Sequence, residues 1–274
     1  MLPEDLARNP INVPLIWAEI QQEIREALAV EPTLASYYQA TILNHARFSD
    51  AIAYHLANLL ATPSLGAMTL QALFEEALQT ETHLEKSMMR DIRAHRERDP
   101  ACDKLYIPFL FFKGFQALSS WRIAHWLWQQ GRRPLALFLQ HQISQVFAVD
   151  IHPGAVIGAG IMIDHATGVV IGETAIIDDN VSMLHAVTLG GSGATRARRH
   201  PHIKQGVLIG AGAKLLGNIV VGEGAKIGAG SVVLDSVDTH TTVAGVPAKP
   251  IGRPRVAEPA RDMNHNLDDP ILDL

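Results

Sequence analysis

The sequence lacks the features that mark several classes of protein. Its 274 residues include one cysteine, Cys102, so no disulfide can form within the chain, which fits a reducing compartment. It has no run of about 18 apolar residues that would indicate a membrane span, and its first ten residues, MLPEDLARNP, do not resemble a signal peptide. The net charge of -5 argues against nucleic-acid binding. We therefore expect a soluble, cytoplasmic protein.

What is present divides into two halves of different periodicity. Residues 1–147 are predicted to be helical, because apolar side chains recur at intervals of three and four, as in Trp17, Ile20 and Ile24. Such stripes indicate core or oligomer contacts. With 47% hydrophobic residues, the chain can bury a substantial core and form one or two domains.

In residues 148–254 the period becomes six. Branched aliphatic residues recur at every sixth position: Ile209, Leu215, Val221, Ile227 and Val233. A short, fixed period predicts a stacked β-solenoid, and hexapeptide repeats specify a parallel β-helix. Five glycines recur where we expect the chain to turn corners with positive φ: Gly158, Gly172, Gly210, Gly222 and Gly228.

The repeat is interrupted twice, and both interruptions carry reactive side chains. The step from Ile163 to Ile171 contains DHATG, with Asp164 and His165. The second interruption, GGSGATRARRHPHI, runs from residue 190 to 203 and should form a loop. Because insertions in repeat arrays gather on the binding face, both segments are candidate site elements.

These motifs resemble those of the bacterial serine O-acetyltransferases. The resemblance covers residues 15–254 and rests on DIHP, DHATG and RHP together with the helical half. It implies an α+β fold in which an all-helical N-terminal domain precedes a left-handed parallel β-helix of hexapeptide repeats. It also implies a homotrimer, and a dimer of trimers that forms a hexamer. Acetyl-CoA would be the co-substrate, L-serine the acceptor and L-cysteine an inhibitor, in the first step of cysteine biosynthesis, with no metal expected.

His165 is the candidate general base. A serine hydroxyl must lose its proton as it attacks a thioester, and a positioned histidine can accept that proton. The resemblance implies that Asp150 orients His165. The two are fifteen residues apart, and one solenoid turn of three hexapeptides has about eighteen residues. Asp150 and His165 could therefore lie nearly above one another. On an extended chain Asp164 would point elsewhere. Three other histidines are expected to be structural or merely exposed: His141, His185 and His240.

The other candidate residues come from the resemblance. Asp99 and Asp164 would hold the ammonium group of serine. Arg199, with His200, would grip its carboxylate, for which the planar guanidinium is suited. The remaining expected contacts are the backbone N–H near Gly191 for the oxyanion, Ala211 and Ala229 for pantetheine, and Lys226 for a phosphate of CoA.

Three other classes of protein are alternatives to this interpretation. A trimeric metalloenzyme, such as a γ-class carbonic anhydrase, needs three imidazoles on zinc, and no spacing among the 13 histidines brings three together. A non-catalytic scaffold has no need to break register twice. A sugar or antibiotic acetyltransferase shares the fold and stays open.

Residues 255–274 form the expected C-terminal tail. The segment is rich in Asp, Asn and Pro and has few aliphatic side chains, which predicts a flexible end. The resemblance implies a second interpretation, in which the tail docks into O-acetylserine sulfhydrylase. Leu274 would then fill the partner's active site, and Asp268, Asp269 and Asp273 would aid the encounter. The sequence leaves both interpretations open.

Overall fold

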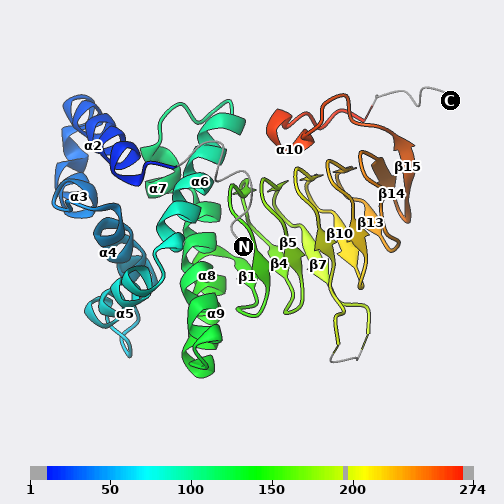
Figure 1. Cartoon of the computed structure of the whole chain (residues 1–274). Helices are drawn as coiled ribbons and strands as arrows, with labels where there is room; N and C mark the ends of the chain where they lie inside the picture. Colours follow the sequence, from blue (N-terminus) through cyan, green and yellow to red (C-terminus); the bar gives the residue numbers. More distant parts are fainter. Residues whose placement is uncertain (1–10, 194–196, 268–274) are drawn as a thin grey trace.

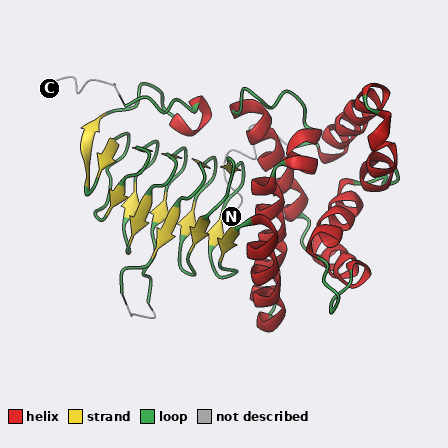
Figure 2. Ribbon diagram, turned by 180° about the vertical axis from the view of Figure 1, so that it is seen from behind, coloured by secondary structure: helices red, strands yellow, loops and turns green. Residues whose placement is uncertain are grey.

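The structure is a computed structural model that describes residues 11–193 and 197–267. A helical region comes first and a parallel β-solenoid follows, so the expected class of fold is confirmed (Figure 1). Figure 2 shows the same order from behind, with the helices stacked against one end of the solenoid. The helical region ends at Phe147, and the first strand begins at Val149.

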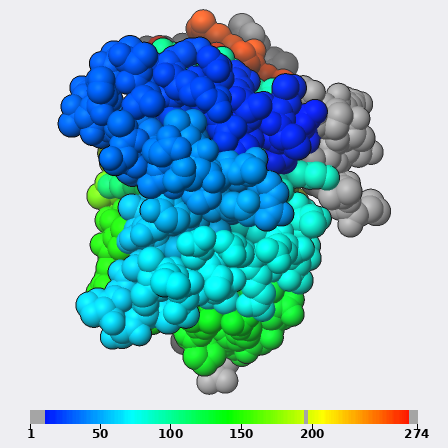
Figure 3. Space-filling model, turned by 90° about the vertical axis from the view of Figure 1, so that its left-hand side faces the viewer, coloured from blue at the N-terminus to red at the C-terminus, as the bar shows by residue number. Residues whose placement is uncertain are grey.

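The helices of the described residues differ widely in length. They are α2 (Val13–Val30), α3 (Ala35–Tyr38), α4 (Phe48–Leu60), α5 (Ala67–Thr80), α6 (His83–Arg98), α7 (Tyr106–Phe111), α8 (Lys113–Gln129), α9 (Arg133–Phe147) and α10 (Pro259–Asp262), with a 3-10 turn, η1 (Pro32–Leu34), and a π turn, η2 (Gln39–Leu43). None of them is long and apolar enough to cross a membrane. The predicted stripe is buried in α2, where Trp17, Ile20 and Ile24 face the core. Figure 3 shows that the earlier helices cover the end of the molecule remote from the solenoid.

The strands are two to five residues long and form three sheets. They are β1 (Val149–Ile151), β2 (Val156–Ile157), β3 (Met162–Ile163), β4 (Val169–Ile171), β5 (Ile176–Ile177), β6 (Ser182–Met183), β7 (Thr188–Gly190), β8 (His202–Ile203), β9 (Leu208–Ile209), β10 (Lys214–Leu216), β11 (Val220–Val221), β12 (Lys226–Ile227), β13 (Val232–Val233), β14 (Thr242–Gly245) and β15 (Ala248–Gly252). The sheets have the orders β1-β4-β7-β10-β13, β2-β5-β8-β11 and β3-β6-β9-β12-β14-β15. All pairs are parallel except β14 with β15.

Successive turns stack in register, but the turns differ in length. Val149 pairs with Val169, twenty residues on, whereas Ile209 pairs with Ile227, eighteen residues on. The first turn is longer because residues 164–168 widen one corner. One buried column runs through the first sheet: Ile151, Ile171, Leu189, Leu215 and Val233. This column is the continuous core that the six-residue period predicts.

The five glycines highlighted by the sequence serve a different purpose from the expected one. None of these five glycines has a positive φ. The glycines that do have a positive φ lie at other positions, such as Gly160 and Gly212. The highlighted positions instead lack room for a side chain. A Cβ at Gly210 would lie 2.6 Å from the amide nitrogen of Ala229, and one at Gly228 would lie 2.8 Å from Ala244 Cβ. The close approach of stacked turns therefore requires glycine there.

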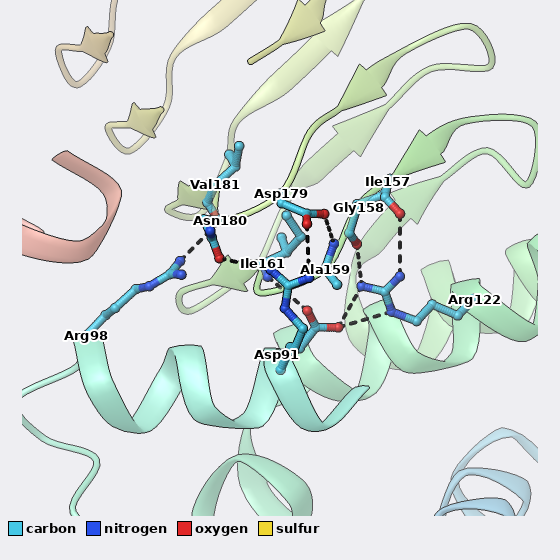
Figure 4. A network of polar contacts seen from close by, with 11 residues as sticks. Asp91, Arg98, Arg122, Ile157, Gly158, Ala159, Ile161, Asp179, Asn180 and Val181 are labelled. Carbon is cyan, nitrogen blue, oxygen red and sulfur yellow. Dashed lines mark hydrogen bonds and ion pairs between the residues drawn. The ribbon is translucent and has the colours of Figure 1, made fainter. Parts of the chain in front are cut away.

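A buried ion pair joins the helices to the solenoid. Arg122 of α8 donates through Nη2 to Asp91 of α6, at 2.7 Å, and to the carbonyl of Gly158, at 2.7 Å. The other carboxylate oxygen of Asp91 accepts the amide of Ile161 at 2.9 Å. Asp91 is fully buried, and this burial raises the pKa of its carboxyl against the opposing effect of Arg122. Figure 4 shows that both side chains point into the first turns of the solenoid.

The segment after β15 folds back along the solenoid toward α6 (Figure 1). Its short helix α10 contacts α6, β6 and β9, and Ala260 is fully buried. Ser182 donates to the carbonyl of Ala260 at 2.8 Å, and Arg98 of α6 donates to Ser182 at 2.9 Å. Part of the expected tail, Pro259–Asp262, is thus a helix that packs against the solenoid, and the flexibility of the tail stays a prediction. Residues 268–274, including Leu274, lie outside the described residues.

Candidate active site

The predicted site residues gather mainly at two of the three corners of the solenoid. We call the corner formed by residues 164–168, 184–187, 210–213 and 228–231 the histidine edge, because it carries His165. The corner formed by residues 172–175, 191–193 and 197–201 is the arginine edge, and it carries Arg199. Within one chain these are different edges of the same prism. The structure therefore divides the predicted serine contacts between two places.

The turn that carries His165 is tight and left-handed. His165 has φ 54° and Ala166 has φ 57°, so the chain is not extended here. The expectation that Asp164 points away from its neighbour was therefore wrong. Asp164 Oδ2 lies 3.6 Å from His165 Nε2, and the His165 side chain remains 73% exposed. The turn between β3 and β4 thus presents a carboxylate and an imidazole together at the surface.

The first turn of α8 contacts this corner from the helical end of the solenoid. Lys113 donates a hydrogen bond to the hydroxyl of Thr167. Gly114 lies so close to the corner that an added Cβ would overlap the carbonyl oxygen of Ile163. The amide of Asp164 donates to Met183 of the next turn at 2.8 Å. The backbone around His165 is therefore held by both the helical region and the solenoid.

Asp150 does not lie directly under His165. Because the first turn has twenty residues, the residue paired with Asp150 is Val170. The expectation of an eighteen-residue turn was wrong here, since residues 164–168 lengthen the corner. The Asp150 carboxylate accepts a hydrogen bond from Gln140 of α9 at 2.7 Å. Its role as the partner of His165 stays a prediction.

The arginine edge is organised around Arg199. Its Nη2 lies 2.6 Å from Glu173 Oε2, and its backbone N–H donates to Thr174 Oγ1 at 3.0 Å. The guanidinium holds the pKa of the Glu173 carboxyl below its usual value. In this arrangement Arg199 binds a carboxylate of its own chain. The residue type and the geometry both suit a carboxylate ligand.

His200 is packed beneath Arg199. Its Nδ1 accepts the Thr174 amide at 3.2 Å and lies 2.8 Å from the Thr174 hydroxyl. Burial, and then the charge of Arg199, lowers the pKa of His200. Gly172 leaves the space that the imidazole fills, and Gly191 lies against both Arg199 and His200. Gly191, expected near the oxyanion, is thus on the arginine edge.

The other predicted residues are spread more widely. Asp99 ends α6 and accepts the amide of Ala101 at 2.8 Å, and α6 contacts β3 just before Asp164. Ala211 and Ala229 lie on the histidine edge, where the Gly230 amide donates to the Ala211 carbonyl at 2.8 Å. Lys226 is buried and donates to the carbonyl of Asn266 in the C-terminal segment. Its contact with a phosphate stays a prediction, and would require that segment to move aside.

The sequence interpretation did not name two residues of the arginine edge, and it gave no site role to His185. Glu173 and Thr174 hold the arginine edge together, and His185 packs against His165 with ring centroids 5.9 Å apart. His185 was expected to be structural or exposed. Its position twenty residues after His165 would have been informative if the length of this turn had been known. In the described part of the chain, no group of three or more His, Cys, Asp or Glu side chains could hold a metal ion.

Comparison with known families is decisive. The family model for the N-terminal region of serine acetyltransferase matches residues 16–120, and the bacterial transferase hexapeptide model matches residues 200–235. A serine acetyltransferase of Salmonella typhimurium is 54% identical over 94% of both chains. That of Haemophilus influenzae is 51% identical over 91% of this chain and 93% of the relative. The chain belongs to the serine acetyltransferase family. It is therefore an acyltransferase, as the motifs DIHP, DHATG and RHP predict.

Solved structures of the same family share the whole architecture. Serine acetyltransferase from Vibrio cholerae superimposes with a TM-score of 0.91 at 52% identity, over 92% of this chain and 97% of that one. A serine acetyltransferase in complex with cysteine has a TM-score of 0.90 at 51% identity, over 92% and 98%. The enzyme from Brucella abortus with coenzyme A has 0.85 at 48%, over 87% and 95%. The soybean enzyme with serine has 0.86 at 51%, over 89% and 100%.

Proposed function

We propose that this enzyme transfers the acetyl group of acetyl-CoA to L-serine, with His165 as general base. The serine hydroxyl attacks the thioester carbonyl and His165 takes its proton; the C–S bond then breaks, and the CoA thiolate receives that proton. The observation that carries the proposal is the exposed His165 ring beside Asp164, on a corner held by α8. The serine and coenzyme A bound to the soybean and Brucella enzymes support the choice of substrates. The products are O-acetyl-L-serine and CoA, which places the reaction at the start of cysteine biosynthesis.

The acceptor is a zwitterion, and the two edges offer the matching charges. Asp164 on the histidine edge and Asp99 at the end of α6 would hold the ammonium group. Arg199 and His200 would bind the carboxylate, which must displace or share Glu173. Asp150 would orient or stabilise His165, in the way that a carboxylate supports a catalytic histidine. The oxyanion would be met by a backbone N–H near Gly191.

The division of these residues between two edges favours a site shared by two copies of the chain. In a homotrimer, the histidine edge of one protomer can face the arginine edge of the next, since head-to-tail contacts close into a ring. The larger assembly we propose, a dimer of trimers, would join through the helical regions. Sedimentation of the purified protein distinguishes trimer from hexamer.

Mixing inactive variants tests the shared site directly. His165→Ala and Arg199→Ala each disable one edge, so each homotrimer is expected to be inactive. When both are co-expressed, about a quarter of the interfaces pair two intact edges if protomers mix at random. Activity near that fraction supports sharing. A mixture no more active than its components would show that each site lies within one chain.

The chemistry is tested by thiol release from acetyl-CoA with L-serine, compared with D-serine, threonine and a hexose. We expect L-serine to be strongly preferred, and His165→Ala to lower kcat by about 10²- to 10⁴-fold while the protein stays folded. Asp150→Asn should slow turnover less, because it disturbs only the orientation of the base. More than about a tenth of wild-type kcat in His165→Ala, equivalent to roughly 1.4 kcal/mol, would exclude it as the base.

We also propose that L-cysteine inhibits by occupying the serine site. Cysteine has the ammonium and carboxylate groups of serine, and a related structure holds cysteine. Arg199→Lys should weaken serine and cysteine alike, because lysine cannot form the two-pronged contact of arginine. A raised KM for serine with an unchanged inhibition constant for cysteine would mean that the two bind at different sites.

A final proposal concerns O-acetylserine sulfhydrylase as a partner of the C-terminal tail. The packing of residues 255–267 narrows the segment available for docking to residues 268–274, which lie outside the described residues. Deleting only those residues leaves α10 and its contacts in place. We expect the deletion to abolish association in titration calorimetry and to leave kcat intact. Equal affinity of the two forms would rule out docking by the tail.

A further inference from the structure

A second histidine repeats the position of His165 on the next turn of the solenoid. Ile163 pairs with Met183 in the strand register, so His165 and His185 follow the paired strands at the same distance. The residues after them, Ala166 and Ala186, both have φ 57°. The Ala186 amide donates to the Thr167 carbonyl at 2.8 Å. His185 therefore stands directly above His165 on the histidine edge.

The two imidazoles touch. Their ring centroids are 5.9 Å apart and their planes meet at 65°, which is an edge-to-face contact. Both side chains are exposed at this corner. Apart from this ring contact, the described residues provide no hydrogen bond or ion pair to the His185 side chain. His185 is thus open to a ligand that approaches His165.

The histidine edge continues past His185 to the residues that we expect to contact pantetheine. The Gly212 amide donates to the His185 carbonyl at 2.9 Å, and the Gly230 amide donates to the Ala211 carbonyl at 2.8 Å. Along this edge the order is therefore His165, His185, Ala211 and Ala229. Neighbouring turns are about 4.8 Å apart. A chain-like ligand that passes Ala211 and reaches His165 must cross His185.

We propose that His185 binds the acyl end of acetyl-CoA and holds the thioester against His165. This inference rests on the proposed function, because it assumes that the acetyl group reaches His165. A neutral imidazole offers one N–H donor and one acceptor nitrogen. The pantetheine arm carries an amide two carbons from its sulfur, and this amide is the group His185 meets. His185 is thus a donor-binding residue, and its contact with the His165 ring fixes where that group sits.

The test separates donor binding from acceptor binding. His185→Ala should raise the KM for acetyl-CoA about 3- to 10-fold, the loss expected for one neutral hydrogen bond, with the KM for L-serine within about twofold of wild type. His185→Gln should restore much of the affinity, because its amide also donates and accepts. His83→Ala serves as the matched control, since His83 is an exposed histidine with a side chain 58% accessible at the start of α6. The control should change neither KM.

Titration calorimetry with CoA measures donor affinity in the absence of L-serine, so this test does not depend on the identity of the acceptor. If wild-type protein binds CoA but transfers no acetyl group to L-serine, the proposed function fails and the His185 test still proceeds on the CoA affinity. Weaker CoA binding by His185→Ala at unchanged thermal stability supports the inference. An unchanged CoA affinity and acetyl-CoA KM overturn it. So does an equal rise of both KM values with a lower melting temperature, which would make His185 a structural part of the corner.

Discussion

Gly114 touches the turn that carries His165, and we expect Gly114→Ala to impair catalysis much more than stability. A Cβ at this position would overlap the carbonyl oxygen of Ile163 and come within 3.1 Å of its carbonyl carbon and 3.2 Å of Ala166 Cβ. These are mainly backbone atoms of the corner, so they cannot rotate aside as a flexible side chain would. Either the start of α8 or the corner must move.

The size of the effect follows from two opposed contributions. Alanine in a helix is favoured over glycine by about 1 kcal/mol, so α8 alone would be stabilised. Overpacking a dense contact costs about 1–3 kcal/mol, which leaves a net loss of roughly 0–2 kcal/mol. Relieving the overlap requires a shift on the order of 1 Å, and a misplacement of that size can lower a rate about 10²-fold. We therefore expect a large loss of kcat with a small change in melting temperature.

Gly66→Ala is the matched control, because a Cβ there meets no atom within 4 Å and φ is -71°. Steady-state acetyl transfer and thermal unfolding would be measured for both variants. The control should match wild type in kcat, and its melting temperature should fall only slightly, because alanine is a poorer N-cap of α5 than glycine. A kcat of Gly114→Ala within about twofold of wild type, with an unchanged melting temperature, would refute the reasoning, because it would mean that α8 does not set the geometry of the corner.

Three further predictions concern the junction, acid stability and the arginine edge. Asp91→Asn should lower the free energy of unfolding by about 3–5 kcal/mol, since it leaves a buried charge on Arg122 without a partner. Adding Arg122→Met should recover much of the lost free energy, as measured by urea unfolding at one protein concentration. If the losses of the two single variants simply add, the two side chains are not coupled. Burial lowers the pKa of His55 to about 4 from 6.5, so the unfolded chain binds the proton first as pH falls, and stability should drop between about pH 6.5 and 4. His55→Gln should make that drop in melting temperature shallower without removing it, because burial also lowers the pKa of His95 to about 3; a profile parallel to wild type would contradict the assignment. Glu173→Gln should lower the KM for L-serine about threefold, because Arg199 loses a competing carboxylate; a raised KM would show instead that Glu173 holds Arg199 in its working position.

Much of the fold could be predicted from the sequence because its signals are periodic. The three-and-four spacing in Trp17, Ile20 and Ile24 identifies a helix face, and the six-residue step from Ile209 to Leu215 identifies the solenoid. Both patterns depend only on which side chains must be buried together. The change from helix to strand near residue 148 follows for the same reason.

The arrangement of the site could not be predicted in this way, since it depends on the length of each turn. The extra residues at 164–168 place Val170, and not a residue near His165, opposite Asp150. The contact of Arg199 with Glu173 joins residues twenty-six apart, and no local pattern marks it. The packing of the segment around Ala260 was missed because it depends on a few specific contacts with β6 and α6 and not on an apolar stripe.

Two residues of a solenoid can lie side by side when they occupy equivalent positions in neighbouring turns. Their separation along the sequence does not decide this. His165, His185, Ala211 and Ala229 are separated by 20, 26 and 18 residues, yet they follow one edge because each step completes one turn. The longest step, from His185 to Ala211, includes the extra residues before His202, and the strand pairing continues on both sides of them. Arg199 is among these residues and so belongs to another edge, although it is nearer to His185 in sequence than Ala229 is. An edge built this way can present a continuous track for a long donor, and in the proposed trimer the arginine edge of a neighbouring copy would face it. The residues proposed to bind the donor and those proposed to bind the acceptor then lie on different edges, so each set could vary independently on one scaffold.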